Sequence, residues 1–469
     1  MAVMSNRSVK FGTSGARGLV SDMTDPVCHA FVSAFLQSVA GDAETVVVGH
    51  DLRPSSPRIA RACLDAVISS GRRVVYTGKL PTPAIAFYAE KIHVPALVIT
   101  GSHIPFDRNG IKFYRADGEI SKADEQAMLH ADVELPETVS LVQLPEIDDR
   151  AYKVYVDRYL GFFGKGALEG TKVGVYEHSS VARDVLRDIL EGLGAQVISL
   201  GRTDTFVPID TEAVREEDVI QAREWAEEHA FDAIVSTDGD GDRPLIGDEH
   251  GEWLRGDVVG ILCARYLKAN VVVTPVSCNT AVELCGEFDR VVRTRIGSPY
   301  VIERMERIAG LGIVVGYEAN GGFLLGSDVE QNGKTLEKLP TRDAVLPIVA
   351  LLCTARERGC KVSELTDSLP KRCTASDRLQ NFATEKSHSI LDGLHASPDE
   401  IPMLMAPDAG NYADIDSTDG LRVTFASGDI VHLRPSGNAP ELRCYAESDT
   451  PDRAQQLCQE CLERISSQF

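Results

Sequence analysis

The chain has 469 residues, of which 43% are hydrophobic and 25% are charged, and its formal net charge at pH 7 is −22. This composition is typical of a folded globular protein longer than one ordinary domain, and the acidic balance disfavours nonspecific binding to nucleic acid. The N-terminal residues lack the apolar core of a signal peptide, and no run of eighteen apolar residues occurs. We therefore expect a cytoplasmic protein with no membrane partner, and the 11 scattered cysteines favour reduced thiols over a disulfide framework.

The first distinctive segment is the N-terminal FGTSGARG, where Gly12, Gly15 and Gly18 surround Arg17. The glycines predict a flexible loop that carries a cation. Their spacing matches neither a Walker A loop nor a dinucleotide-binding fingerprint, so the loop by itself assigns no ligand.

An apolar strand-like run, PALVIT, leads into Ser102 and His103, and Lys112 follows ten residues after the serine. Open sheets bind ligands beyond the carboxyl ends of their strands, so this position favours a serine with a chemical role. The alternative is a serine that only satisfies its own loop. A hydrolytic pair of Ser102 and His103 is disfavoured because neighbours in an extended chain point apart, and because the G-x-S-x-G elbow is missing.

A second apolar run, FDAIVST, leads into STDGDGDR, which places Asp238, Asp240 and Asp242 within five residues. Such crowded carboxylates repel one another, and Gly239 and Gly241 allow the backbone to bend so that the oxygens converge. A hard divalent cation would relieve the repulsion. Magnesium fits best if a phosphate substrate completes its coordination shell.

Two other interpretations of this acidic segment remain open. It could be a solvated turn without a metal, or a calcium loop in which Glu249 occupies the twelfth position. Against calcium, Arg243 stands where that loop requires glycine, and a strand instead of a helix leads into it.

Further along, VVRTRIG is followed by Ser298, and the strand-like GIVV leads into GYEANGG, where Glu318 and Asn320 stand two residues apart. Both side chains could bond vicinal hydroxyls of a sugar. The alternative is that Glu318 is a helix cap or a surface acid.

Near the C-terminus, HLRPSGNAPELRCY forms a Pro- and Gly-containing turn between two apolar stretches. Its guanidinium, hydroxyl, amide and backbone donors are suited to a phosphate, although an ordinary hairpin is the alternative. The candidate phosphate ligands are Arg434, Ser436, Gly437, Asn438 and Arg443. The later Cys458 and Cys461 are interpreted as ordinary helical cysteines, because no second pair accompanies them for zinc.

Strand-like and helix-length segments alternate up to about residue 369, which favours α/β units built on parallel strands. TRDAVLPIVALLCTARERG is expected to form the last helix of this part. The final hundred residues change to a small α+β pattern. We predict three successive mixed α/β domains and a C-terminal α+β domain around a central cleft, with the boundaries 1–145, 146–252, 253–368 and 369–469.

Taken together, TSGARG, TGSHIPFDRNGIK, DGDGDR, GYEANGG and RPSGNAPELR resemble the ordered motifs of the α-D-phosphohexomutase family, the phosphomannomutases and phosphoglucomutases. They occur in the family's order and span residues 13 to 443. No single motif is specific, but the combination of the serine loop, DGDGDR and RPSG is.

The resemblance implies a phosphohexomutase whose Ser102 carries a phosphoryl group and takes part in binding Mg²⁺ together with the three aspartates. Arg17 and Lys112 would flank the phosphoserine, with Lys112 or His103 as proton carrier and His103 also orienting the phosphoryl group. The expected substrate contacts are Arg243 to the phosphoryl group, Ser298, Glu318 and Asn320 to the sugar, and the C-terminal turn to the distal phosphate. A hexose 1,6-bisphosphate would serve as intermediate and activator, and the protein would be a monomer or homodimer.

Two departures from the family pattern bear on the sugar. Many relatives carry Glu-x-Ser-x-His in the sugar loop, whereas the matching residues here are Glu318, Asn320 and Gly322, and Ser298 stands where some relatives have histidine or aspartate. The resemblance implies mannose phosphate as the leading substrate. The alternatives are a glucose or glucosamine phosphate mutase, a noncatalytic sugar-phosphate binding protein and a metal-dependent phosphatase.

Overall fold

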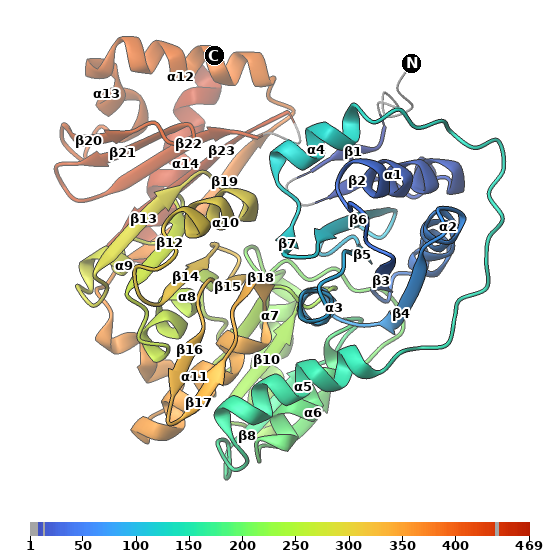
Figure 1. The fold of residues 1–469 in the computed structure, drawn as a ribbon. Helices are drawn as coiled ribbons and strands as arrows, with labels where there is room; N and C mark the ends of the chain where they lie inside the picture. The colour runs from blue at the N-terminus through green and yellow to red at the C-terminus, as the bar shows by residue number, and fades with distance from the viewer. Residues whose placement is uncertain (1–7, 13–14, 437–439) are drawn as a thin grey trace.

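The computed structural model describes residues 8–12, 15–436 and 440–469. Four main β-sheets follow one another along the chain, each with its own helices, and we refer to these units as domains I to IV. Figure 1 shows them in an arc, with domain I and the C-terminal domain IV at its two ends. This arrangement confirms the predicted fold class of three α/β units and a C-terminal α+β unit.

Domain I is built on a seven-stranded sheet with the order β1-β2-β6-β5-β3-β4, in which β7 pairs with β6. Strands β3, β4 and β5 are parallel, and β6 runs antiparallel to β5. The strands are β1 (Lys10–Phe11), β2 (Ala16–Leu19), β3 (Thr45–His50), β4 (Arg73–Lys79), β5 (Ala96–Ile99), β6 (Arg108–Arg115) and β7 (Gly118–Glu119). The helices are α1 (Asp25–Ser38), α2 (Ser56–Ser69), α3 (Thr82–Lys91) and α4 (Lys122–Leu129).

Domain II contains a four-stranded sheet with the order β11-β10-β8-β9, where only β11 is antiparallel to its neighbour. Its strands are β8 (Lys172–Tyr176), β9 (Gln196–Leu200), β10 (Ala233–Thr237) and β11 (Pro244–Gly247). Its helices are α5 (Arg150–Phe163), α6 (Arg183–Gly192) and α7 (Glu216–His229). The acidic, Pro-containing segment 130–149 joins it to domain I and runs along the outside of that domain (Figure 1).

Domain III has a five-stranded sheet with the order β13-β12-β14-β15-β18 and a separate hairpin of β16 and β17. Its strands are β12 (Val271–Pro275), β13 (Arg290–Thr294), β14 (Val314–Tyr317), β15 (Phe323–Leu325), β16 (Val329–Gln331), β17 (Lys334–Leu336) and β18 (Leu339–Asp343). Its helices are α8 (Gly256–Tyr266), α9 (Ala281–Leu284), α10 (Ser298–Arg307) and α11 (Val345–Arg358), followed by a 3₁₀ helix, η2 (Ser363–Ser368).

Domain IV is an antiparallel sheet with the order β19-β23-β22-β21-β20, and α14 packs on β19 and β23. Its strands are β19 (Cys373–Gln380), β20 (Tyr412–Asp416), β21 (Leu421–Phe425), β22 (Ile430–Pro435) and β23 (Glu441–Ser448). Its helices are α12 (Thr384–Ala396), η3 (Pro398–Glu400), α13 (Ile401–Met405) and α14 (Pro451–Gln468), and the predicted helical cysteines Cys458 and Cys461 lie on the buried face of α14.

The same local arrangement occurs once in each of the first three domains. A buried parallel strand ends, a short loop follows, and the chain returns as the antiparallel neighbour of the strand that it has just left. The pairs are β5 with β6, β10 with β11, and β14 with β15. These three connections are the serine, aspartate and sugar loops of the sequence. The same strand–loop–strand arrangement therefore positions all three loops.

Hydrophobic packing separates domain IV from the rest. One continuous core includes helices α3, α5, α8 and α11 and therefore joins domains I, II and III. The core of domain IV is a separate cluster formed by residues between 375 and 465. Burial of apolar surface consequently holds the first three domains together, while Thr280, Arg295 and Ile296 of domain III donate hydrogen bonds to domain IV.

Besides the parallel strands expected from the alternating pattern, the sheets of domains I to III contain antiparallel strands, because β6, β11 and β15 run antiparallel to their neighbours. The helix expected from residue 341 begins at Val345, since Thr341, Arg342 and Asp343 complete strand β18. No helix in the described ranges is long and apolar enough to span a bilayer.

Candidate active site

Ser102 lies directly beyond the end of β5 and is 1% exposed. Its backbone has φ = 50°, a left-handed conformation that is rare for a residue other than glycine. The backbone N–H donates to Thr100 Oγ1 at 2.8 Å, and the side-chain Oγ donates to Asp238 Oδ2 at 2.6 Å. A strained backbone held by such contacts is typical of functional sites, and here it directs the hydroxyl at the acidic loop.

Arg53 holds the serine loop in this conformation. Its guanidinium donates to the carbonyl oxygens of Ser102 at 2.9 Å, Pro105 at 2.7 Å and Arg108 at 2.9 Å, and also to that of Ile104. Arg53 was not among the residues predicted from the sequence, and it follows β3 about fifty residues before the loop. No local pattern indicates that its planar fork reaches across the sheet.

The three aspartates converge on the serine from the loop between β10 and β11, and each is at most 1% exposed. One ligand oxygen from each lies within 4.8 Å of the others. Gly241 adopts φ = 72°, and a Cβ atom on Gly239 would lie 2.8 Å from the Ser102 carbonyl oxygen. The glycines of DGDGDR therefore permit the turn and the close approach of the two loops.

Lys112 reaches this acidic group from β6. Its Nζ donates to Asp240 Oδ2 at 2.7 Å and to Asp242 Oδ2 at 2.6 Å. Thr82, at the start of α3 and not predicted from the sequence, also donates to Asp240 Oδ2 at 2.6 Å. Burial alone would raise the pKa of Asp240, but Lys112 and these hydrogen bonds bring it below the usual range.

Asp238 behaves in the opposite way. Burial and the neighbouring charges of Asp240 and Asp242 raise its pKa well above the usual range. The surroundings of Asp238 thus disfavour its ionised form, in agreement with the repulsion expected from the sequence. Added positive charge would stabilise the ionised form.

The donor set fits a hard divalent cation. The Oδ1 atoms of Asp240 and Asp242 are buried and have no hydrogen-bond partner among the described residues, although buried carboxylate oxygens are normally satisfied. Carboxylate and hydroxyl oxygens are suitable ligands for Mg²⁺. Glu249 is turned away and accepts from Ser363 Oγ at 2.6 Å, so the geometry opposes a calcium loop.

Three arginines surround the acidic group, namely Arg17 from β2, Arg243 beside the aspartate loop and Arg342 from β18. Burial together with the positive charges of Arg243 and Arg342 lowers the pKa of Arg17 to about 10. Such crowding of cations favours an anionic ligand. Arg342 was not among the predicted site residues, because the sequence pattern around it predicts a helix.

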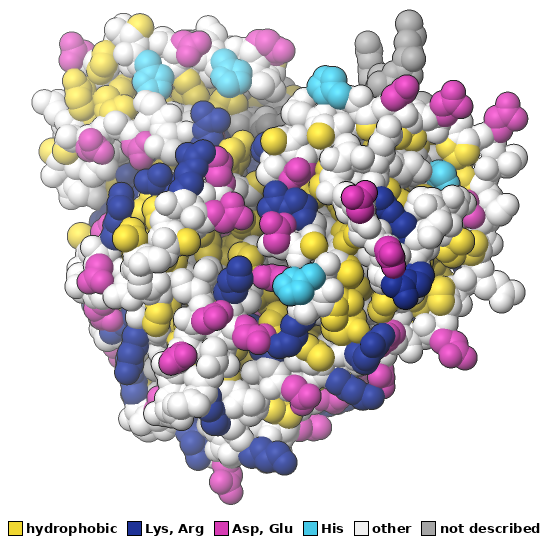
Figure 2. Space-filling model, viewed as in Figure 1, with side chains coloured by type: hydrophobic (Ala, Val, Ile, Leu, Met, Phe, Trp, Pro, Cys, Tyr) yellow, Lys and Arg dark blue, Asp and Glu magenta, His cyan; other side chains and the backbone are white. Residues whose placement is uncertain are grey.

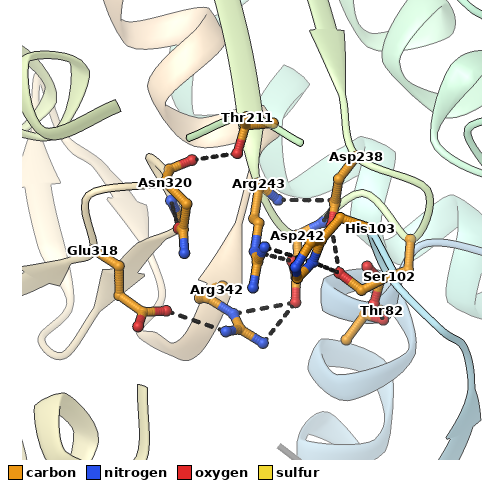
Figure 3. A network of polar contacts seen from close by, with 12 residues as sticks. Thr82, Ser102, His103, Thr211, Asp238, Asp242, Arg243, Glu318, Asn320 and Arg342 are labelled. Atoms are coloured by element: carbon orange, nitrogen blue, oxygen red, sulfur yellow. Dashed lines mark hydrogen bonds and ion pairs between the residues drawn. The ribbon is translucent and has the colours of Figure 1, made fainter. Parts of the chain in front are cut away.

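His103 faces Arg243 at the edge of this group (Figure 3). Arg243 Nη1 lies 2.7 Å from His103 Nδ1, and Ser102 Oγ lies 3.4 Å from the same nitrogen. The positive charge of Arg243, reinforced by burial, lowers the pKa of His103 to about 2. His103 is therefore a neutral imidazole whose Nδ1 accepts a hydrogen bond from the arginine.

The sugar loop lies across the site from Ser102, and Figure 3 shows Glu318 joined to Asp242 through Arg342. Glu318 is 5% exposed and Asn320 is 7% exposed. Asn320 Oδ1 accepts from the Gly322 N–H at 3.0 Å, and the Asn320 carbonyl accepts from Thr211 Oγ1 at 2.7 Å. Glu318 is thus a buried side chain of the site and not a surface acid.

The predicted phosphate ligands that the structure describes lie apart from this group, in domain IV. Arg434 lies near the end of β22 and donates through Nε to Asp419 Oδ2 at 2.8 Å, and Arg443 on β23 lies 3.4 Å from Glu441 Oε2. Arg434 and Ser436 line a surface groove of about 880 Å³, whereas Gly437 and Asn438 lie outside the described residues. Figure 2 shows Lys and Arg side chains gathered where domain IV meets domain III.

Ser298 begins α10 close to this border. It is buried, and its Oγ has no hydrogen-bond partner among the described residues. The preceding loop contacts domain IV, because the Ile296 N–H donates to Asp419 Oδ2 at 3.0 Å. Since Asp419 also binds Arg434, the loop before Ser298 and Arg434 of β22 share a common carboxylate.

Family models match all four domains. Three are described as phosphoglucomutase/phosphomannomutase alpha/beta/alpha domains I, II and III, at residues 8–134, 153–251 and 255–373, and the fourth as the C-terminal domain, at residues 384–464. A protein called phosphomannomutase from Salmonella muenchen is 46% identical, with 100% of this chain and 98% of that protein covered.

Another phosphomannomutase, from Sinorhizobium fredii, is 45% identical and covers 98% of this chain and 99% of its own length. A solved structure described as a putative phosphomannomutase from Thermus thermophilus has a TM-score of 0.78 at 21% identity, covering 99% and 100% of the two chains, which shows the fold. The four matched domains and these full-length relatives place the chain in the phosphoglucomutase/phosphomannomutase family, the α-D-phosphohexomutases.

Proposed function

We propose that this protein is a phosphomannomutase that interconverts mannose 1-phosphate and mannose 6-phosphate. The observation that carries the proposal is the Ser102 hydroxyl, held 2.6 Å from Asp238 in a buried group of carboxylates and surrounded by cations. The choice of mannose is supported by the 46% and 45% identical full-length relatives that bear the name phosphomannomutase. The chain departs from the family pattern at Gly322 and Ser298. The sugar would therefore be recognised without a histidine in the sugar loop.

The reaction requires Ser102 to enter the cycle as a phosphoserine. Attack by the free sugar hydroxyl of mannose 1-phosphate on the phosphorus forms a new O–P bond and breaks the bond to Ser102 Oγ. The product is mannose 1,6-bisphosphate. After this intermediate turns round in the cleft, Ser102 attacks its 1-phosphate, so the serine is phosphorylated again and mannose 6-phosphate leaves.

Asp238, Asp240, Asp242 and the phosphorylated Ser102 would hold Mg²⁺, because three of them offer converging carboxylate oxygens and two of the aspartates have an oxygen without a partner among the described residues. When bound, Mg²⁺ supplies Lewis-acid stabilisation of the charge on the transferring phosphoryl group. The chain's own contribution is to bury these carboxylates and to fix their orientation through Lys112 and Thr82.

Cationic side chains bind the transferring group itself. Arg17 and Arg243 would contact the phosphoryl oxygens, which carry the charge that these guanidinium groups match. His103 would orient the group as a neutral imidazole. The low pKa of His103 favours Lys112 as the proton carrier, since its ammonium group has protons to donate.

Recognition of the sugar phosphate is divided between two domains. Glu318, Asn320 and Ser298 of domain III would bind the sugar. The distal phosphate would be bound by the turn of domain IV, through Arg434, Ser436, Gly437, Asn438 and Arg443. Arginine is suited to this role because its planar fork matches two phosphate oxygens.

We also propose a cytoplasmic location and a monomeric or homodimeric state. All eleven cysteines are free thiols, and eight of them are buried, as expected for a reducing compartment. No contact between subunits is needed to assemble the site, because domains I to IV of one chain supply every candidate residue.

The test is phosphorus NMR of mannose 1-phosphate with the protein, Mg²⁺ and a trace of hexose 1,6-bisphosphate. The 6-phosphate signal should grow with the native chain and stay absent with Ser102→Ala. Equal rates on glucose 1-phosphate would remove the mannose assignment, and release of inorganic phosphate would indicate a phosphatase. Binding without any conversion would leave only a sugar-phosphate binding protein.

A further inference from the structure

Arg342 is a buried cation shared by two loops of the site. It lies on β18 and is 2% exposed. Its Nη2 lies 2.9 Å from Asp242 Oδ2, while its Nη1 lies 3.1 Å from Glu318 Oε2 (Figure 3). One planar guanidinium therefore compensates a carboxylate of the proposed metal group and a carboxylate of the sugar loop at the same time.

The residues on either side of Arg342 fix its backbone. Thr341 Oγ1 donates to Glu119 and lies 3.2 Å from the Tyr114 hydroxyl, both in domain I. On the other side, Asp343 accepts from two tyrosine hydroxyls of α5 in domain II, Tyr155 at 2.7 Å and Tyr159. Three consecutive residues of β18 thus bind to side chains from domains I, II and III, so the arginine has little freedom to follow one loop and leave the other.

Gly322 of the sugar loop, which has no side chain, leaves space for the side chain of Arg342. A Cβ atom on Gly322 would lie 2.7 Å from Arg342 Cδ and 2.9 Å from Cγ. The guanidinium beyond these atoms is held by two carboxylates, so the stem has no room to give way. Gly322 is therefore matched to Arg342, and a side chain at position 322 would displace the bridge.

We propose that Arg342 is a positioning residue that couples the sugar loop to the metal ligand Asp242. The proposal rests on the proposed function of the site, because it assigns Glu318 to the sugar and Asp242 to the metal. When Glu318 engages sugar hydroxyls, its hold on Arg342 changes, and the charge that Arg342 presents to Asp242 changes with it. By reciprocity, occupancy of the metal site changes the affinity of the sugar loop.

Physical chemistry fixes the sign of this coupling. If Glu318 loses its charge, Arg342 pairs with Asp242 alone, and a cation held at a metal ligand opposes the binding of a divalent cation. Without Arg342, no side chain joins Glu318 to Asp242, and the Glu318 carboxylate acts on the metal group only as a separate charge through space. Removal of the Glu318 charge should therefore weaken metal binding more strongly while Arg342 is present.

The test measures Mn²⁺ binding to the full-length protein by calorimetry, without turnover, in a double-mutant cycle. Glu318→Gln should weaken Mn²⁺ binding by about three- to tenfold in the native background, within the usual range for residues that share a network. In the Arg342→Gln background the same change should alter the Kd by less than about twofold. Equal effects in the two backgrounds would refute the coupling.

Two further variants separate the bridge from a mere positive charge. Arg342→Lys keeps the charge without the planar fork, and Gly322→Ala keeps the arginine but displaces its stem, so both should reduce the Glu318→Gln effect to less than about twofold. A full effect in either variant would show that no bridge is needed. Arg293→Gln is the matched control, because Arg293 is a largely buried arginine of domain III paired with Glu283, and the Glu318 effect should persist in it.

The double-mutant cycle for Mn²⁺ binding can be evaluated independently of the mutase assignment. Absence of mutase activity on every hexose phosphate would end the proposed function while leaving the Mn²⁺ measurement to decide the coupling. Conversely, an additive cycle in an active mutase would refute the coupling alone. Melting temperatures of all variants identify any that fail to fold, and Arg342→Lys and Gly322→Ala provide two independent substitutions for the test.

Discussion

The serine loop should depend on the shape of the Arg53 side chain and not only on its charge. The guanidinium donates to four carbonyl oxygens spread from Ser102 to Arg108, and its central carbon lies 4.3 Å from the centre of the Phe206 ring. Arg53→Lys retains the charge and most of the stem. It removes the planar fork, so the substitution isolates the geometry of the clamp.

The size of the effect follows from the number of carbonyls. The three N–H groups of an ammonium diverge from one nitrogen, so the lysine of the Arg53→Lys variant would reach at most two of the four acceptors. A hydrogen bond to a charged group contributes about 1.5–3 kcal/mol, and loss of two predicts destabilisation by about 3 kcal/mol or more. Released from the clamp, Ser102 would leave its left-handed conformation, and a displacement of about 1 Å can lower turnover on the order of 10²-fold.

Urea unfolding gives the change in stability, and the mass of the intact protein after incubation with hexose 1,6-bisphosphate gives phosphorylation of Ser102. The matched control is Arg293→Lys, because Arg293 likewise donates to three carbonyls, those of Pro275, Cys278 and Asn279. The control should lose comparable stability yet still become phosphorylated. An Arg53→Lys protein destabilised by less than about 1 kcal/mol, with native turnover, would refute the clamp.

Three further substitutions have definite expected outcomes. Gly239→Ala places a Cβ atom 2.8 Å from the Ser102 carbonyl oxygen, so turnover of mannose 1-phosphate should fall at least about tenfold, and native turnover would contradict the close approach. Tyr155→Phe removes one of two hydroxyl donors to Asp343 and should lower the free energy of unfolding in urea by about 1–3 kcal/mol; an unchanged value would contradict this bond. Burial lowers the pKa of His432 to about 4, against about 6.5 when unfolded, so the unfolded chain binds more protons between these pH values and stability falls as pH decreases from 6.5 to 4. His432→Gln should reduce the dependence of the unfolding free energy on pH in this window by the equivalent of up to one bound proton. An unchanged slope against pH would contradict the assignment.

The strands of the fold were predictable because their apolar runs are short, β-branched and bounded by turn residues. PALVIT, FDAIVST and GIVV do form β5, β10 and β14. The direction of the strands that follow them was not predictable. Hydrophobic periodicity indicates which face of a strand is buried. The pattern is the same for an antiparallel strand that returns at once and for a parallel strand reached by a crossover.

Candidate site residues can be recognised from the sequence where they gather in one loop. Asp238, Asp240 and Asp242 lie within five residues, so their convergence needs only a local turn. Arg342 and Arg53 act across sheets, at ends of strands far from the loops that they bind. Arg342 was missed because TRDAVLP continues without a break into an apolar helix, and only sheet pairing of Phe323 with Asp343 ends the strand there.

The charge balance of the site explains why a metal and a phosphoryl group would be bound together. When Asp238 is ionised, as a bound cation would favour, four buried acids match four cations: Asp238, Asp240, Asp242 and Glu318 against Lys112, Arg17, Arg243 and Arg342. A divalent cation alone, or a phosphoryl dianion alone, would leave two charges uncompensated in a region with little water, which is costly. A dication and a dianion entering together preserve the balance. An acidic protein of net charge −22 can therefore bind an anionic substrate without a broad basic surface, because the compensating charges are confined to these few side chains.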